Sequence, residues 1–206
     1  MKIAIIGAGN VGKALSRSLS KAGHQVTLSA AHQEHASEVA DDLGITAASS
    51  NLQAVKESDA VVLAVPFSGA GEEVAHEIAP VADGKIVIDA TNPIGPDLKL
   101  VTEGSSAAEM FQRWLPKAKV VKAFNTMFAS RQGQPTDGDV QLDGFVAGDD
   151  QEAKRKVMAI IDSLGLRPID AGELASARVL EGMALLNIKL QIANGWAWRS
   201  AWKLVD

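Results

Sequence analysis

Apolar residues gather in short unbroken runs, and between these runs they recur at helical spacing. The runs are rich in valine and isoleucine and show little alternation of apolar and polar residues. Alternation is expected of strands with one solvent-exposed face, whereas continuous apolar runs are typical of parallel strands covered by helices on both faces. The pattern predicts strands at residues 2–6, 25–28, 60–65, 85–89, 119–122, 144–147 and 166–169.

Segments with the helical period alternate with these strands. This alternation predicts an α/β fold, doubly wound around a mainly parallel sheet. Ser106, with Glu109 three residues later, has the spacing of a capping box and would begin one of the helices. The expected helices span residues 10–22, 33–43, 71–79, 106–115, 151–164 and 174–194.

A segment rich in glycine, proline, glutamine and aspartate, residues 132–143, is expected to be a loop. It separates a core over residues 1–131 from a smaller part over residues 144–206. The smaller part is too short for an independent domain. We therefore expect a single domain over residues 1–206, in which residues 144–206 form a strand-and-helix extension of the same sheet.

Composition excludes several classes of protein. The chain has no cysteine, which removes disulfides, zinc knuckles, iron–sulfur clusters and thiol nucleophiles. Its 20 Lys and Arg against 25 Asp and Glu give a net charge of −5, which argues against a nucleic-acid partner. The longest apolar run, residues 60–67, is far shorter than the roughly 20 residues that cross a bilayer. We expect a cytoplasmic protein with no membrane or metal partner.

A glycine motif, Gly7-Ala8-Gly9-Asn10-Val11-Gly12, follows the first predicted strand and opens the first predicted helix. The spacing alone is weak evidence, but this position is the one that a dinucleotide site requires. Gly7 would allow the tight turn, Gly9 the approach of a pyrophosphate, and Gly12 the close packing of helix on strand. A glycine turn without a ligand is the alternative. We favour a Rossmann-type fold that binds a dinucleotide.

The end of the second strand bears on which dinucleotide binds. NAD-binding proteins commonly carry a carboxylate there for the ribose 2′-hydroxyl, about 20 residues past the glycines. This chain reads Leu28-Ser29-Ala30-Ala31-His32-Gln33, without an acid. Nothing repels a 2′-phosphate, and Ser29 and His32 can donate to one, so NADP is favoured. No arginine follows, however, and a serine that merely ends the strand is the alternative.

Three further strand ends carry residues suited to line a pocket. Ligands of open α/β sheets bind beyond the carboxyl ends of the strands. Ordinary strand termination is the alternative at each place. The candidates for the cofactor are Val65, Pro66, Phe67, Ala90, Thr91, Asn92 and Pro93, and those for the substrate side are Asn125 and Thr126.

Several motifs together carry a resemblance to a known family. They are Gly9-Asn10-Val11-Gly12, Val65-Pro66-Phe67, residues 120–126, Gly148-Asp149-Asp150, residues 166–172 and residues 177–181. On these, the sequence resembles the NADPH-dependent deazaflavin (coenzyme F420) reductase family, also called F420:NADP oxidoreductase-like. It is also similar to the cytosolic domain of six-transmembrane ferric reductases. The resemblance covers nearly the whole chain.

The resemblance implies NADP(H) as cofactor and hydride exchange with a deazaflavin or flavin. It implies that residues 8–11 hold the pyrophosphate and residues 29–31 the 2′-phosphate. It also implies that residues 65–67 line the adenosine and ribose side and that residues 90–93 approach the nicotinamide. Direct hydride transfer needs no acid or base, so no catalytic residue is expected. The chain departs from common members at Ala30 and Ala31, where they have arginines, and at Asn125, where archaeal members have histidine.

The last predicted helix is apolar on more than one side. Leu180, Met183, Leu186 and Leu190 share one stripe, and the segment from Trp196 to Trp202 follows it with three of the four tryptophans. Such a helix is buried, either by its own chain or by a second subunit. Aromatic residues are enriched at interfaces, so we expect a homodimer through this region. Packing within one chain is the alternative.

These features lead to an NADP(H)-dependent oxidoreductase that transfers a hydride to or from a deazaflavin, flavin or other small acceptor. The alternative is a noncatalytic NADP(H)-binding sensor or regulatory protein. A reductase of small imines or hydroxy acids commonly adds a substrate domain of more than ~100 residues. Too few residues follow Asp150 for such a domain.

Overall fold

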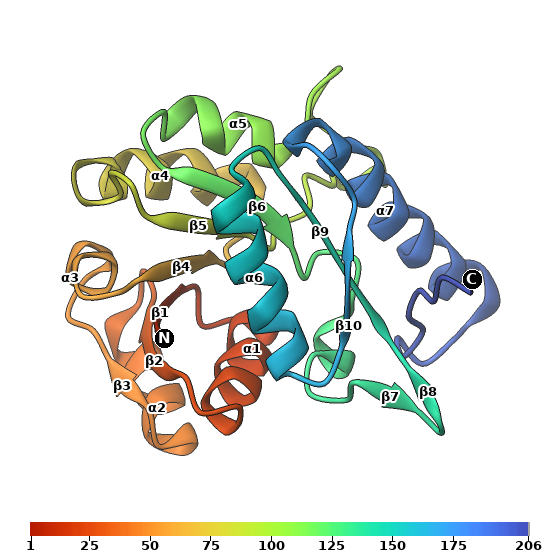
Figure 1. The fold of residues 1–206 in the computed structure, drawn as a ribbon, viewed down its shortest axis with the longest axis horizontal. Coiled ribbons are helices and arrows are strands. Elements are labelled where there is room, and N and C mark those ends of the chain that lie inside the picture. Colours follow the sequence, from red (N-terminus) through yellow and green to blue (C-terminus); the bar gives the residue numbers. More distant parts are fainter. Residues whose placement is uncertain (206) are drawn as a thin grey trace.

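The computed structural model describes residues 1–205. A single eight-stranded sheet crosses the middle of the molecule in the order β10-β9-β6-β5-β4-β1-β2-β3, with helices on both faces (Figure 1). Neighbouring strands are parallel except for β6 and β9, which are antiparallel. The α/β prediction is confirmed. The strands are β1 (Lys2–Ile6), β2 (Gln25–Ser29), β3 (Thr46–Ala47), β4 (Ala60–Leu63), β5 (Ile86–Asp89), β6 (Lys119–Ala123), β9 (Asp143–Gly148) and β10 (Arg167–Asp170).

The two faces of the sheet bury separate apolar clusters. One cluster lies beneath α1 (Asn10–Lys21), α2 (Gln33–Leu43) and α6 (Gln151–Ser163). The other lies beneath α3 (Asn51–Lys56), α4 (Glu72–Ile78) and α5 (Ala107–Trp114), together with the start of α7 (Ala177–Asn194). Because strands such as β4 are buried on both faces, they consist almost wholly of apolar residues.

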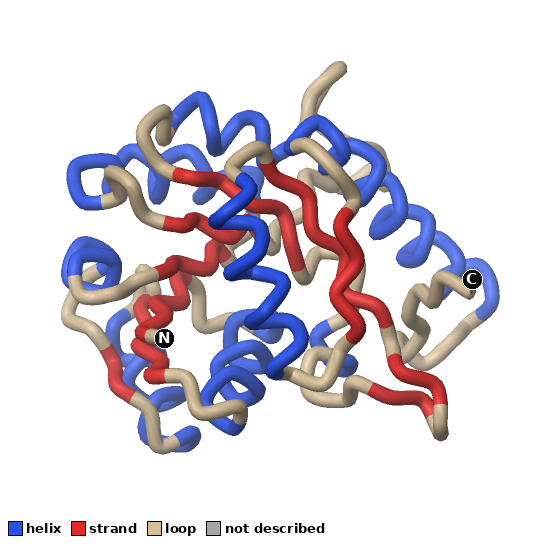
Figure 2. Tube along the Cα trace, viewed as in Figure 1, coloured by secondary structure: helices blue, strands red, loops and turns tan. Residues whose placement is uncertain are grey.

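The shortest elements differ from the sequence prediction. The strand β3 and the helix α3 were not expected, and the segment expected to be a loop contains a hairpin of β7 (Thr136–Asp137) and β8 (Val140–Gln141) (Figure 2). The turn of the hairpin includes Gly138, whose φ of +58° suits glycine. Strands of two residues are too short to leave a periodic pattern in the sequence, which explains why they were missed.

The C-terminal part adds strands at the β6 edge of the sheet. β9 pairs with β6 and β10 pairs with β9, while α7 lies at that end of the molecule, away from β2 and β3 (Figure 1). The buried carboxylate of Asp143 accepts hydrogen bonds from Arg167 (2.8 and 3.0 Å), Lys203 (3.0 Å) and the Leu204 backbone N–H (2.6 Å). This carboxylate therefore fastens the tail that follows α7 to the sheet.

The helix α7 has an unusual polarity. Its buried side carries Glu181, Asn187 and Gln191, of which Glu181 meets the sheet and the other two bond to Trp198 and Ser200 in the following segment. Leu186 and Ile192, by contrast, are about half exposed. The stripe expected to be buried is therefore split, because Leu180 is buried and Leu186 is not. Within residues 1–205 no helix has both the length and the apolar character needed to span a membrane.

Candidate dinucleotide site

The predicted site residues lie in loops at one edge of the sheet. β1, β2, β4, β5 and β6 are mutually parallel, so their carboxyl ends meet at the same edge (Figure 1). Backbone hydrogen bonds join these loops: the Gly7 N–H donates to the Ser29 carbonyl (2.8 Å), and the Ala90 N–H donates to the Leu63 carbonyl (3.2 Å). Residues far apart in the sequence are thereby brought to one edge.

The three glycines of the first turn differ in their surroundings. Gly7 has a φ of +116°, and a Cβ there would lie 2.4 Å from the Ala64 carbonyl oxygen. A Cβ on Gly12 would lie 1.8 Å from the Gly7 carbonyl oxygen. A Cβ on Gly9, by contrast, would meet no described atom within 4 Å. Gly9 is the N-cap of α1, so this open space lies where the free N–H groups and positive dipole of the helix favour a phosphate. The first turn therefore fits a pyrophosphate.

The Ser29 hydroxyl is already engaged within the protein. Ser29 is buried, and its hydroxyl donates to the Asn51 Oδ1 at 2.7 Å. The Asn51 amide in turn donates to the Glu77 carboxylate at 2.7 Å. A hydroxyl has one proton to donate, so Ser29 cannot also donate to a 2′-phosphate in this arrangement. The partner Asn51 begins α3, a helix that the sequence pattern did not reveal.

With the Ser29 hydroxyl engaged, the start of α2 supplies the polar groups that could meet a 2′-phosphate at the end of β2. His32 is the exposed N-cap of this helix, and Ala31 before it is also exposed. Ala30 is half-buried and packs against the apolar cluster beneath α1 and α2. A 2′-phosphate at this place would meet the His32 imidazole and the helix N-terminus.

The loop after β4 is anchored by aromatic packing. The Phe67 ring lies 5.8 Å from that of Phe111 and 5.9 Å from that of Trp114, both on α5. Phe67 thus turns its ring toward α5, while Pro66 is exposed and Val65 half-buried at the strand end. The contribution of Phe67 to a ligand would come from its backbone.

The ends of β5 and β6 are joined by two asparagines. The Asn92 amide donates to the Asn125 carbonyl at 2.9 Å, and the Asn125 amide donates to the Asn92 Oδ1 at 3.0 Å. The Oγ1 of Thr91 and the Oδ1 of Asn125 are buried and have no hydrogen-bond partner among the described residues. Buried polar atoms normally have partners. The amide of a nicotinamide would supply the hydrogen-bonding groups that these oxygens lack.

Behind this loop lies a buried charge cluster that the sequence analysis missed. Lys122 on β6 contacts Asp89 at the end of β5 (2.9 Å) and Glu181 on α7 (2.7 Å), and all three side chains are fully buried. Burial raises the pKa of Glu181 to about 7, although the charge of Lys122 opposes that rise. A lysine inside the apolar run Val120-Val121-Lys122-Ala123 was the available signal, since lysine is rarely buried without a partner.

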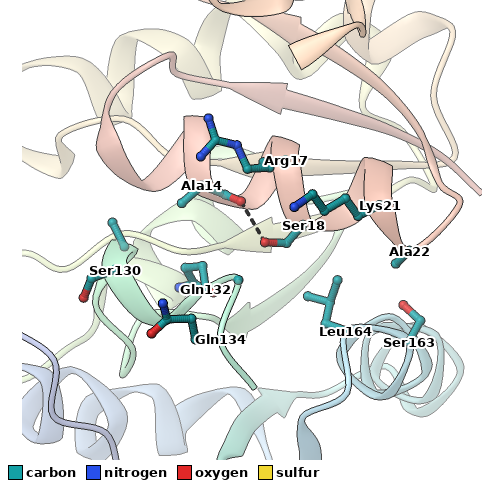
Figure 3. Close-up of a pocket in the computed structure, with 12 residues that line it drawn as sticks. Ala14, Arg17, Ser18, Lys21, Ala22, Ser130, Gln132, Gln134, Ser163 and Leu164 are labelled. Atoms are coloured by element: carbon teal, nitrogen blue, oxygen red, sulfur yellow. Dashed lines mark hydrogen bonds between the residues drawn. The ribbon is translucent and has the colours of Figure 1, made fainter. Parts of the chain in front are cut away.

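Two of the cavities beside α1 also have Ala129 and Ser130 in their lining. One, of about 520 Å³, lies between the second half of α1, residues 129–134 and the end of α6; Ser18, Gln132 and Leu164 line it (Figure 3). It includes none of the predicted site residues. The other, of about 510 Å³, begins at Asn10 in the first turn and reaches Trp198. The second cavity therefore borders the candidate site.

The fold and the site define a class of protein. An open parallel sheet with a glycine turn after its first strand, and with polar residues at the carboxyl ends, is typical of dinucleotide-dependent oxidoreductases. Residues 2–93 match the family described as NADP oxidoreductase, coenzyme F420-dependent. The chain is also 31% identical to the F420-dependent NADP reductase of Methanocaldococcus jannaschii, over 93% of each protein. The protein belongs to this family of oxidoreductases.

Other relatives agree with this assignment. A solved structure titled as a putative F420-dependent NADP reductase from Arthrobacter sp. FB24 superposes with a TM-score of 0.88, at 30% identity and over 100% of both chains. The rat metalloreductase STEAP3 is 29% identical over 89% of this chain, which spans 36% of that protein. The resemblance inferred from the motifs is confirmed.

Proposed function

We propose that the protein transfers a hydride between NADP(H) and a deazaflavin coenzyme of the F420 type. The observation that carries this proposal is the match to the M. jannaschii F420-dependent NADP reductase along nearly the full length of both proteins. We further propose that residues 1–206 act as one domain, so that the second substrate binds on the edge of the sheet that holds the dinucleotide.

The first turn would hold the dinucleotide by its pyrophosphate. Backbone N–H groups at the start of α1, from Ala8 to Val11, donate to the phosphate oxygens in the open space beside Gly9. The 2′-phosphate lies at the start of α2 beside His32. The Ser29 hydroxyl is held by Asn51 and does not donate to the 2′-phosphate. The backbone carbonyl of Ser29 accepts the Gly7 N–H, so Ser29 helps to position the first turn.

The nicotinamide end would lie against the ends of β5 and β6. Thr91 and Asn125 offer the unpartnered oxygens, and the Asn92–Asn125 pair fixes the spacing of the two loops. Bound NADPH supplies the hydride, and the role of the protein is to hold two planar rings at reacting distance and exclude water. Direct transfer from ring to ring would need no protein acid or base, because the proton that accompanies the hydride in reducing the deazaflavin can come from water.

The test is a steady-state assay of the purified protein. NADPH is offered with coenzyme F420, FMN, FAD or riboflavin, and loss of the NADPH absorbance is followed. The proposal expects F420 to be reduced with the highest kcat/KM, and NADPH to be used in preference to NADH. Tight binding of NADPH with no acceptor reduced would contradict it and favour the sensor or regulatory alternative.

We also propose that the protein is a homodimer through α7 and the segment that follows it. This proposal is supported by the exposed apolar residues of this region: Val179 and Leu186 are seven residues apart and lie on one side of α7, and Ile192 and Trp196 are exposed further along. A twofold axis brings the same apolar surface of two copies together and buries it. Within a single described chain, these apolar side chains stay exposed.

Size-exclusion chromatography with light scattering measures the mass of the protein in solution and tests the dimer with two matched variants. Leu186→Glu places a charge on the α7 surface and is expected to give a monomer. Leu52→Glu makes the same change at an exposed leucine of α3 and is expected to keep the dimer. A wild-type protein that elutes with the mass of one chain would contradict the proposal.

A further inference from the structure

The buried cluster of Lys122, Asp89 and Glu181 joins the site to α7. It places one ammonium and two carboxylates in the protein interior, all fully buried. Burial of charged groups costs several kcal/mol per ion unless hydrogen bonds compensate it. The cluster needs a reason beyond packing, because an apolar side chain would fill the same space without that cost.

All three hydrogen-bond donors of the Lys122 ammonium have an acceptor within the protein. Its three ammonium protons meet Asp89 Oδ2 (2.9 Å), Glu181 Oε1 (2.7 Å) and the carbonyl oxygen of Thr91 (2.6 Å). An ammonium group has three donors and no acceptor, so its orientation is set by these three partners. Loss of one partner would leave one ammonium proton without an acceptor and the orientation of Lys122 set by two partners instead of three.

The same cluster holds both backbone groups of Thr91. Lys122 donates to the Thr91 carbonyl, and Asp89 Oδ1 accepts the Thr91 N–H at 2.8 Å. Thr91 and Asn92 form the loop where the nicotinamide is proposed to lie. The position of this loop therefore depends on the ion pair between Lys122 and Asp89.

Glu181, on α7, connects Lys122 and the Thr91 loop to α5. Its carboxylate also accepts the Ala107 backbone N–H at the start of α5, at 3.0 and 3.2 Å. One side chain of α7 thus bonds to β6 through Lys122 and to α5 through Ala107. Without it, one of the three protons of the buried ammonium and the Ala107 N–H would both lack their present acceptor.

We propose that Glu181 is a positioning residue for hydride transfer, which acts through Lys122 and Asp89 to fix the Thr91 backbone beside the nicotinamide. The proposal rests on the function proposed above. The pyrophosphate and the 2′-phosphate are held by other loops, so loosening of the Thr91 loop affects the orientation of the nicotinamide more than the affinity for NADPH. Misplacement of a reacting group by about 1 Å can lower the rate by ~100-fold.

The test compares Glu181→Gln with Glu109→Gln as a matched control. Glu109 on α5 binds Arg178 on α7 at 2.6 and 2.8 Å, so it joins the same two helices without contacting Lys122. We expect Glu181→Gln to lower kcat by about 10- to 100-fold with an unchanged Kd for NADPH. Glu109→Gln is expected to leave both values unchanged. An equal loss of kcat in both variants, or an unchanged kcat in Glu181→Gln, would overturn the proposal.

A second readout needs no acceptor. The fluorescence of the nicotinamide in bound NADPH reports the surroundings of the ring, and it is expected to change in Glu181→Gln at an unchanged Kd. If the wild-type protein reduces no acceptor, the proposed function fails, and this readout still decides the positioning role: an unchanged emission overturns it. If Glu181→Gln does not fold, Glu181→Asp, which keeps the charge and withdraws the carboxylate, is measured in its place.

Discussion

Replacement of Gly9 by valine tests the dinucleotide site with little effect on the fold. Gly9 has φ −72° and ψ −173°, an extended conformation that valine adopts readily. No described atom lies within 4 Å of the added Cβ. The added Cβ therefore enters the space that the pyrophosphate is proposed to use.

The two expected effects differ in size. Loss of two hydrogen bonds to a charged phosphate costs about 3–6 kcal/mol, which weakens binding of NADPH by at least ~100-fold. Valine is a poorer N-cap than glycine, which costs about 1 kcal/mol of the free energy of unfolding. For a chain of this length that cost lowers the Tm by roughly 2–4 °C.

Isothermal titration with NADPH, together with thermal unfolding of the ligand-free protein, measures both effects. Gly9→Ala adds a smaller group at the same place and is expected to lose less affinity than Gly9→Val. A Gly9→Val protein that unfolds cooperatively and binds NADPH as tightly as the wild type would refute the assignment of the first turn.

Two further substitutions test how the site and the tail are held. Gly12→Ala is expected to destabilise the protein, because its Cβ would lie 1.8 Å from the Gly7 carbonyl oxygen; an unchanged Tm would show that the turn can move aside. Asp143→Asn is expected to lower the free energy of unfolding by about 3 kcal/mol and to make the C-terminal tail sensitive to protease. Burial alone would raise the pKa of Asp143, but hydrogen bonds from Arg167, the Leu204 N–H and Lys203 lower it below its usual value. A carboxyl with a lowered pKa stabilises the fold above its unfolded pKa of about 4, and this contribution is lost as the pH falls through the folded value. As the pH falls, the wild type should therefore lose free energy of unfolding that Asp143→Asn does not lose. Identical dependence of stability on pH in the two proteins would contradict this reasoning.

The parts of the fold that follow from local pattern were predictable. β4 is wholly apolar, and β1, β5 and β6 are mainly apolar, because both faces of the sheet are covered. The first-turn glycines occupy fixed positions after β1. The capping pattern was also correct: the Ser106 hydroxyl accepts the Glu109 N–H at 3.1 Å at the start of α5.

Features that depend on distant partners were not predictable. Ser29 was expected to face a phosphate, but its hydroxyl is bound by Asn51, which lies on a six-residue helix with too little sequence to show a period. The buried side of α7 includes a glutamate because Glu181 meets Lys122 there, and residues so far apart along the chain are joined only by the fold.

The most direct test of the account follows the hydride itself. NADPH carrying deuterium at the transferred position of C4 is mixed with the protein and oxidised coenzyme F420, and the products are analysed by mass spectrometry and NMR. Direct transfer predicts that the deuterium appears on C5 of the reduced deazaflavin, where the new C–H bond does not exchange with water. Failure to reduce the deazaflavin, or a reduced deazaflavin that has taken its hydrogen from solvent, would contradict the account.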